Sequence, residues 1–438
     1  MFKEFSKTLQ IAVPIIISNI AQISLLLIDS AMIGRINYLQ LAASSLVINV
    51  MAIPQVIGMG MTVAMSPLIA IANGRKDVLT ASKILFNGLI LCTITSLLLS
   101  FCLVLNKNVI FHLGQDYTVA KLATPFYEII AWSLIPLLMF MAVKQFTDAL
   151  EFTRTGMLLT IISLPINAFL NWIFIYGKFG MPRLELYGAG IATFITRIII
   201  TVTLIIVVLS HPVFKPYIKI WRKAWKIKFE LWKELLQIGI PSSLQYGMES
   251  GAFSVSGIMI GWLGATAQAA HQIALNVAAA TFMVALGLSL GASIRVANAY
   301  GRGEKYQLRI IGKSTIAGGL IYGFFCAGLF IALKNVLPFI FTNDVKVTAM
   351  ASTLLIFGAL FQVSDTSQAI GVGLLRGIKE VKLPTAFVGI AYWLIGIPTG
   401  YYLAFKINMG ASGIWIGFVA GLTVSALLLN KRFLNKTK

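Results

Sequence analysis

Long apolar stretches separated by short polar segments run through the whole chain. Residues 85–105, 155–177 and 187–210, for example, carry almost no charge. An α-helix of about 20 apolar residues crosses the hydrocarbon core of a bilayer, whereas the strands of a membrane β-barrel alternate polar and apolar residues. The pattern therefore predicts membrane-spanning helices. Twelve are predicted, at 10–33, 42–71, 84–105, 123–149, 156–177, 187–210, 233–262, 268–296, 314–333, 348–374, 384–404 and 410–430.

The composition agrees with this pattern, because 58% of the 438 residues are hydrophobic and 11% are charged. A soluble domain carries about 25% charged residues. The net charge of +20 is compatible with a nucleic-acid partner, but most Lys and Arg residues lie on one predicted side, which is the positive-inside pattern of membrane proteins. We therefore predict no nucleic-acid partner, two cytoplasmic termini, and a basic segment from Lys215 to Lys233 that lies on anionic membrane lipid.

An internal repeat emerges when the chain is aligned with itself at a single ungapped offset, the one that places Pro14 on Pro241. The same offset places Leu9-Gln10-Ile11 on Leu236-Gln237-Ile238, Met32-Ile33-Gly34 on Met259-Ile260-Gly261, and Gly74-Arg75 on Gly301-Arg302. Six predicted spans separate the copies, so both halves have the same orientation in the membrane. The predicted fold class is an all-α membrane protein with twelve transmembrane helices in two pseudo-symmetric six-helix bundles around a central cleft. The N-terminal lobe is predicted at 1–210, a basic cytoplasmic linker at 211–232, and the C-terminal lobe at 233–438.

Besides Glu234 at the start of the seventh span, five acidic residues fall inside predicted spans, where an ionised carboxylate at the bilayer centre costs about 2.5–3.5 kcal/mol on insertion scales. They are Asp29, Glu128, Asp148, Glu249 and Asp365. Asp148 follows Lys144 by four residues, a spacing that lets the two side chains pair on one helix face. Glu128 lies close to the outer end of its span and can reach interfacial water. We predict that Asp148 and Glu128 have structural roles.

Glu249 and Asp365 are the strongest candidates for a transport site, because no Lys or Arg lies within one helical turn of either. Tyr246 stands one turn before Glu249, and Ser364 directly precedes Asp365. Carboxylates among hydroxyl and amide oxygens, without a basic neighbour, suit a hard monovalent cation or a shared proton. We predict that Glu249, Asp365, Tyr246 and Ser364 form a cation or proton site, in which Glu249 and Asp365 are the candidate Na⁺ ligands.

A second polar group is predicted in the N-terminal half. Gln22 lies seven residues before Asp29 on the same helix face, and Asn167 and Asn171 form an i,i+4 pair on the fifth span. We predict that these four residues form a proton or substrate site. His271, at the start of the eighth span, is predicted to be structural or interfacial.

The sequence lacks the motifs of ATP-driven pumps and of enzymes. Gly312-Lys313-Ser314 resembles the end of a phosphate-binding loop, but Gln307 occupies the position of the required earlier glycine. No sizeable soluble segment is left to hold a catalytic site. We therefore predict a protein that is not an enzyme, needs no cofactor beyond a coupling ion, and takes its energy from an ion gradient.

Three segments resemble the multidrug and toxin extrusion (MATE) family of secondary transporters, and the resemblance covers essentially the whole chain. They are Ala269-Ala270-His271-Gln272-Ile273-Ala274-Leu275-Asn276, Leu374-Leu375-Arg376-Gly377 and Phe174-Ile175-Tyr176-Gly177-Lys178-Phe179-Gly180. The pairing of Glu249 in span seven with Asp365 in span ten is similar to the NorM-type branch. The resemblance implies a cation site at these two acids and a role for Asp29 in proton coupling or drug binding. Phe361, four residues before Asp365, is a departure, because similar proteins can carry a Tyr there.

The resemblance implies Na⁺- or H⁺-coupled export of cationic or amphipathic organic compounds by a monomer in a bacterial inner membrane. The alternative is a flippase for a lipid-linked saccharide, or an exporter of one specific native metabolite. A flippase needs a strongly cationic cleft. Apart from Lys233 and Arg295, which lie at the ends of their spans, Lys144 and Arg197 are the only basic candidates within the spans. A membrane enzyme or a passive channel forms a third class, which the missing catalytic motifs and the acids without basic partners disfavour.

Overall fold

The computed structural model describes residues 1–112, 114 and 116–438, which form helices and no β-strand. The first half contains α1 (Phe2–Gly34), α2 (Tyr38–Val63), α3 (Met65–Gly74), α4 (Val78–Leu105), η1 (Lys107–His112), α5 (Tyr117–Trp132), α6 (Leu134–Ala149), α7 (Thr153–Tyr176) and α8 (Glu185–Ser210). Two short helices, α9 (Lys215–Lys219) and α10 (Trp221–Ala224), follow. The second half contains α11 (Phe229–Gly261), α12 (Ala265–Arg302), α13 (Lys305–Leu333), η2 (Leu337–Ile340), α14 (Val345–Gly377), α15 (Lys382–Gly389), η3 (Ile390–Gly396), α16 (Ile397–Tyr401), η4 (Tyr402–Lys406) and α17 (Ala411–Lys436). The predicted all-α class is confirmed.

Eleven helical segments of the described chain are long and apolar enough to cross a membrane, and each coincides with a predicted span. The remaining predicted span, the seventh, is occupied by α11, a helix of 33 residues. Polar residues such as Gln245 and Glu249 lower the hydropathy of this helix. The helix that departs from a simple membrane pattern is therefore the one that carries a predicted transport acid.

Three of the described spans are broken into consecutive helices: the second into α2 and α3, the fourth into α5 and α6, and the eleventh into α15, η3, α16 and η4. The fourth span changes from α5 to α6 at Ser133, because Pro136 has no amide hydrogen to donate to the carbonyl group four residues earlier. Side chains of α8 cross this break: Arg197 Nη1 donates to Ser133 Oγ over 2.6 Å, and Thr201 Oγ1 donates to the Pro136 carbonyl over 2.8 Å. Hydrogen bonds from α8 thus fix the break in the fourth span.

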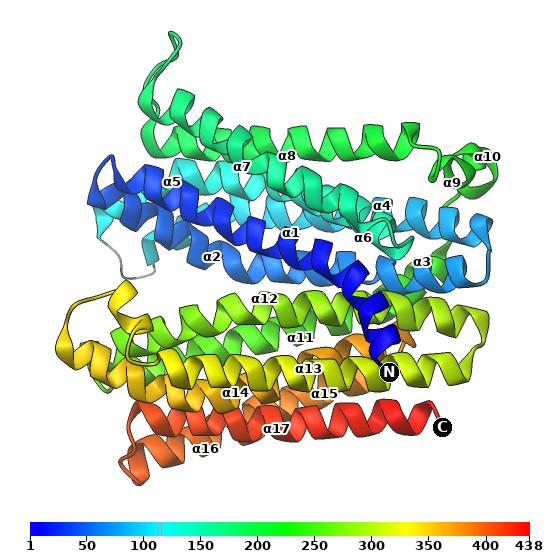
Figure 1. Ribbon diagram of the computed structural model, residues 1–438. Helices are drawn as coiled ribbons and strands as arrows, with labels where there is room; N and C mark the ends of the chain where they lie inside the picture. Colours follow the sequence, from blue (N-terminus) through cyan, green and yellow to red (C-terminus); the bar gives the residue numbers. More distant parts are fainter. Residues whose placement is uncertain (113, 115) are drawn as a thin grey trace. The chain divides into compact units, whose positions relative to one another are not determined.

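The residues group into two compact units, one of residues 17–243 and the other of residues 1–16 together with 244–438. In the unit of residues 17–243, α7 packs on α8, α4 packs on α6, and α2 packs on α5, and Figure 1 shows these long helices side by side. The basic segment after α8 docks on this unit, since Tyr217 Oη donates to Asn73 Oδ1 over 3.0 Å. Trp225 stacks on Phe86 of α4 with ring centroids 5.2 Å apart.

In the unit that contains residues 244–438, α14 packs against α12, α13 and α17. Apolar side chains such as Leu354, Trp415 and Phe418 fill its core. The eleventh span, residues 382–406, contains the two π-helical segments η3 and η4, and it packs on α17 at glycines. A Cβ atom on Gly417 would lie 2.5 Å from the Gly400 amide nitrogen, so the two backbones approach closely only without side chains.

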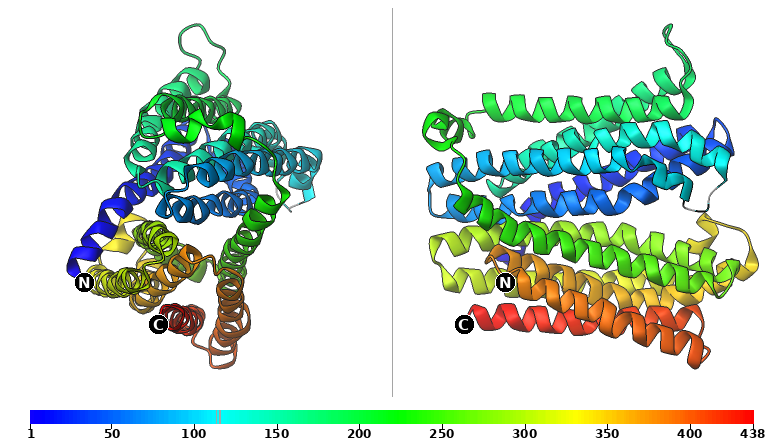
Figure 2. Two further views of the ribbon diagram at one scale, coloured as in Figure 1. Left: turned by 90° about the vertical axis from the view of Figure 1, so that its right-hand side faces the viewer. Right: turned by 180° about the vertical axis from the view of Figure 1, so that it is seen from behind.

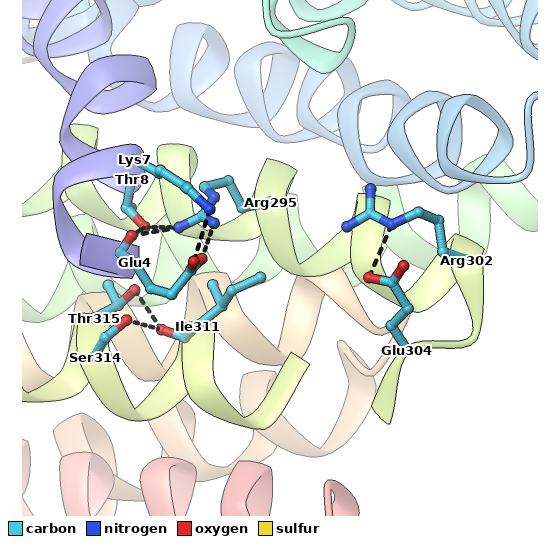
Figure 3. A network of polar contacts seen from close by, with 9 residues as sticks. All are labelled: Glu4, Lys7, Thr8, Arg295, Arg302, Glu304, Ile311, Ser314 and Thr315. Carbon is cyan, nitrogen blue, oxygen red and sulfur yellow. Dashed lines mark hydrogen bonds and ion pairs between the residues drawn. The ribbon is translucent and has the colours of Figure 1, made fainter. Parts of the chain in front are cut away.

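The start of α1, up to Ile16, belongs to the same unit as residues 244–438. In the left view of Figure 2, this start of α1 lies beside the yellow-green helices of the unit. Figure 3 shows the anchor: Arg295 of α12 forms an ion pair with Glu4 and donates to Thr8 Oγ1 over 2.8 Å. The predicted lobes, 1–210 and 233–438, follow the sequence duplication, whereas the compact units divide α1 and α11 internally.

Candidate ion and substrate sites

Glu249 lies on α11 and is held by amide groups from two helices. Its Oε1 accepts one hydrogen bond from Gln245 Nε2, one turn earlier on the same helix, and another from Gln368 Nε2 of α14, each over 3.1 Å. Within the described residues, Glu249 forms no ion pair with Lys or Arg. The carboxylate is therefore oriented by neutral donors, which leaves its charge free to be balanced by a small cation or a proton.

A small cavity of about 20 Å³ adjoins this carboxylate. Its lining residues are Gln245, Tyr246, Glu249, Phe282, Leu286, Ser289, Gln368, Ala369, Val372 and Arg376. Glu249 and Arg376 are the charged members of this set. The predicted residue Tyr246 contributes its hydroxyl oxygen, which accepts a hydrogen bond from Arg376 Nη1 over 3.3 Å, and the guanidinium carbon lies 5.6 Å from the Tyr246 ring centroid.

Asp365 is 4% exposed and forms no hydrogen bond or ion pair within the described part of the chain. Its neighbours on α14 include Gln362 and Thr366, whose buried side-chain oxygen and nitrogen atoms also have no hydrogen-bond partner. Polar atoms buried in this way commonly contact water or an ion. Gln368, one turn after Asp365, is the residue that connects this region of α14 to Glu249.

Ser364 and Gln22 are predicted site residues that the structure does not join to the acids. Ser364 Oγ lies 2.7 Å from Thr423 Oγ1 of α17, because consecutive residues of a helix point in different directions. Gln22 forms no hydrogen bond with Asp29 within the described residues. The helical spacing of Gln22 and Asp29 places them on one face of α1, but it does not make them partners.

The predicted N-terminal group is assembled from α1, α7 and α8. Asp29, 9% exposed, accepts hydrogen bonds from Asn171 Nδ2 over 2.6 Å and from Thr193 Oγ1 over 3.2 Å. Asn171 also donates to Asn167 Oδ1 over 3.0 Å. Buried Asn171 Oδ1 and Asn167 Nδ2 have no partner in the described chain. The group thus presents a carboxylate, amide oxygens and a hydroxyl group, which are donors that suit a hard cation or a proton.

The other charged groups within the spans have structural partners. Lys144 Nζ lies 2.8 Å from Asp148 Oδ2, and both side chains are buried. Glu128 forms an ion pair with Lys107 over 2.6 Å. His271 is 1% exposed, and its Nδ1 accepts a hydrogen bond from Trp415 Nε1 over 3.2 Å. These contacts match the structural roles expected for the three residues.

Four residues at these sites are absent from the predicted set: Gln245, Gln368, Thr193 and Arg376. A threonine within an apolar span carries no sequence signal of its own. Arg376 marks the end of its span, at about 16 Å from Asp365 by the helical rise. Helical side chains lean towards the helix N-terminus, and the long arginine side chain thereby reaches Tyr246. The sequence signal for Arg376 is its place at the C-terminal end of a span, from which a long basic side chain extends back into the membrane.

The MatE family profile matches the chain twice, over residues 14–173 and 241–402. The two matches start at Pro14 and Pro241, the pair that the internal alignment superposes, which confirms the repeat. Among curated proteins, a "Probable multidrug resistance protein NorM" from Bradyrhizobium diazoefficiens is 33% identical over 98% of this chain and 93% of its own length. The "Multidrug resistance protein MdtK" of Edwardsiella ictaluri is 32% identical over 98% of this chain and 95% of its own length.

Solved structures show the same fold. The crystal structure titled "eukaryotic MATE transporter AtDTX14" superposes with a TM-score of 0.87 over 100% of this chain and 99% of that chain, at 22% sequence identity. With both halves matched by the family profile, and with these curated relatives aligned over nearly their full length, the chain is a multi-pass membrane protein that belongs to the multidrug and toxin extrusion family, in its NorM-type branch.

Proposed function

We propose that this protein is a secondary active antiporter that exports cationic or amphipathic organic compounds in exchange for Na⁺ or H⁺. Its NorM and MdtK relatives are named as multidrug resistance proteins, which supports the substrate class. We place it in the inner membrane of a bacterium, with both termini cytoplasmic and the monomer as the working form. The exposed basic side chains of α9 and of the segment after it support the cytoplasmic location of this region.

The observation that carries the proposal is the state of the span acids. Asp148 and Glu128 have lysine partners, whereas no ion pair holds Asp29, Glu249 or Asp365 within the described residues. A carboxylate kept in a membrane without a fixed counter-charge is costly and is best explained by a mobile one. Glu249 and Asp365 are accordingly assigned to the coupling ion, with Tyr246 as the neighbouring hydroxyl group.

The N-terminal group of Asp29, Asn171 and Asn167 is assigned to proton or substrate binding. Asp29, with Asn171 and Asn167, binds a proton or the positively charged part of the substrate. The coupling ion drives export only through a difference between its affinities for the two orientations of the transporter. The ion site and the N-terminal group are therefore expected to lose affinity in turn as the protein changes orientation.

Dye efflux from proteoliposomes tests this proposal, with sodium and proton gradients imposed separately on a fluorescent organic cation. Glu249→Gln and Asp365→Asn are expected to insert normally and to lose gradient-driven efflux, because a neutral amide neither releases a proton nor balances a cation. Glu128→Gln is the matched control, since Glu128 has a lysine partner and is half-exposed. Wild-type efflux from both Glu249→Gln and Asp365→Asn would refute the assignment, and solute leakage without any gradient would indicate a channel.

A further inference from the structure

Arg376 is a buried cation without a full set of partners. The residue is 2% exposed at the end of α14, yet within the described residues only its Nη1 is hydrogen-bonded, to the Tyr246 hydroxyl over 3.3 Å. Its Nε and Nη2 atoms are buried and have no hydrogen-bond partner in the described chain. A buried charge is costly unless it is paired and hydrogen-bonded. One long bond to a neutral hydroxyl group satisfies this cation incompletely.

The best available partner for this cation lines the same cavity. Glu249 and Arg376 both border the space of about 20 Å³, which is close to the size of one water molecule. Tyr246, which now holds Arg376, precedes Glu249 by three residues, or about 4.5 Å along the helix. A guanidinium group binds a carboxylate more strongly than a phenol, in a two-bond arrangement that uses the donors now unpaired. Because Glu249 and Arg376 line one cavity, a change of rotamer turns the long arginine side chain towards the carboxylate.

We propose that Arg376 is an internal counter-ion, which pairs with Glu249 when the coupling ion leaves and returns to Tyr246 when the ion binds. The inference rests on the proposed function, because it assigns a cation to Glu249. In this scheme Gln245 and Gln368 hold Glu249 in the ion-loaded arrangement. Arg376 is a positioning residue that weakens ion binding and thereby promotes ion release, since two cations cannot share one carboxylate at full strength.

The charged and titratable groups around Glu249 define what else could act on it. On α11 the nearest is Tyr246, and on α14 they are Asp365 and Arg376. The lining residues of α12, Phe282, Leu286 and Ser289, are uncharged. Tyr392 of η3 is buried, and its side chain is an uncharged phenol at neutral pH. Arg376 is therefore the only cation among the described residues of this set. Its replacement by a neutral residue removes the one positive charge that can pair with Glu249.

Carbodiimide labelling of Glu249 tests the proposal without a transport assay. Dicyclohexylcarbodiimide reacts with a protonated carboxyl group, and bound Na⁺ protects a carboxylate that it occupies. The full-length protein is labelled in detergent over a range of pH and Na⁺ concentration, and each site is quantified by peptide mass spectrometry. Arg376→Gln is expected to raise the labelling rate of Glu249 by about tenfold or more at fixed pH, the effect of losing one nearby opposite charge. In a sodium-binding protein, less Na⁺ is then needed for protection.

A second variant is expected to change the labelling rate of Glu249 in the opposite direction, which a general loosening of the fold would not do. Tyr246→Phe removes the hydroxyl group that competes for Arg376, and it is expected to slow the labelling of Glu249. Asp29, in the other compact unit, serves as the internal control and should label at the wild-type rate in both variants. An unchanged rate at Glu249 in Arg376→Gln, faster labelling in Tyr246→Phe, or an equal rise at Asp29 would overturn the proposal.

The outcome remains separable from that of the proposed function. If Glu249→Gln still supports driven efflux, then Glu249 is not the coupling site and the proposed function fails there. The labelling result still reports whether Arg376 and Glu249 interact. If efflux depends on Glu249 but labelling ignores Arg376, then the antiport proposal stands and the internal counter-ion does not.

Discussion

The buried pair of Lys144 and Asp148 offers a quantitative test of which span acids are structural. The two charged atoms are 2.8 Å apart, and the side chains are 9% and 5% exposed. At an effective dielectric constant of about 20, the Coulomb attraction is roughly 6 kcal/mol, and desolvation opposes most of it. Loss of one partner leaves an unpaired buried charge, which costs about 3–5 kcal/mol. Loss of both charges removes the attraction and the desolvation cost together.

A double-mutant cycle separates these terms. Lys144→Met and Asp148→Asn are each expected to lower stability by about 3–5 kcal/mol, and the double variant by no more than about 1 kcal/mol. A thiol-reactive dye reports thermal unfolding, because Cys92 and Cys326 are buried while the exposed Cys102 is replaced by Ser to remove background. The double variant should also retain driven efflux. Equal stability of all four proteins, or a double variant as unstable as the two single ones combined, would refute a structural pair.

Three further outcomes are expected. Asp29→Asn lowers efflux by about tenfold or more, since an amide cannot bind or release a proton at neutral pH, as measured in proteoliposomes against the wild type. Gly373→Ala lowers the thermal midpoint and costs about 1–3 kcal/mol of stability, because its Cβ would collide with the α12 backbone. Gly257→Ala is the control, since the space around Gly257 is open, and it is not expected to lower the midpoint. Arg295→Ala speeds amide hydrogen exchange of residues 2–12, since it removes their anchor; unchanged exchange would show that apolar packing alone holds this segment.

The fold is accessible from sequence because its signals are local or repetitive. Apolar runs locate the spans, and one ungapped offset, visible at Pro14 and Pro241, locates the duplication. An ion pair within one helix is also predictable from spacing, as the pair of Lys144 and Asp148 shows. Each of these inferences needs only the geometry of one helix.

Contacts between helices are not accessible in the same way. Gln368 is a sequence neighbour of Asp365, yet it bonds Glu249, because the register of α14 against α11 decides which side chain it meets. Ser364 turns to α17 for the same reason. Arg376 reaches the site only because a long side chain spans the last turns of its helix. Register and side-chain reach depend on tertiary packing, which a single sequence does not encode in any readable pattern.

The duplication also accounts for the limits of the compact units. Ile16 packs on Gly287 of α12 inside the unit of residues 244–438. The offset that superposes the two halves carries Ile16 onto Ser243 and Gly60 onto Gly287. Ser243 packs on Gly60 inside the other unit, where a Cβ on the glycine would lie 2.5 Å from the Ser243 Cα atom. The same contact therefore occurs twice, once in each unit.

Each of these contacts places one end of a continuous helix in one unit and the rest of it in the other. The unit limits fall after Ile16 in α1 and after Ser243 in α11, shortly beyond Pro14 and Pro241. Proline removes a backbone hydrogen bond and permits a kink. The repeat thus places a proline at the same point of α1 and α11, shortly before each unit limit.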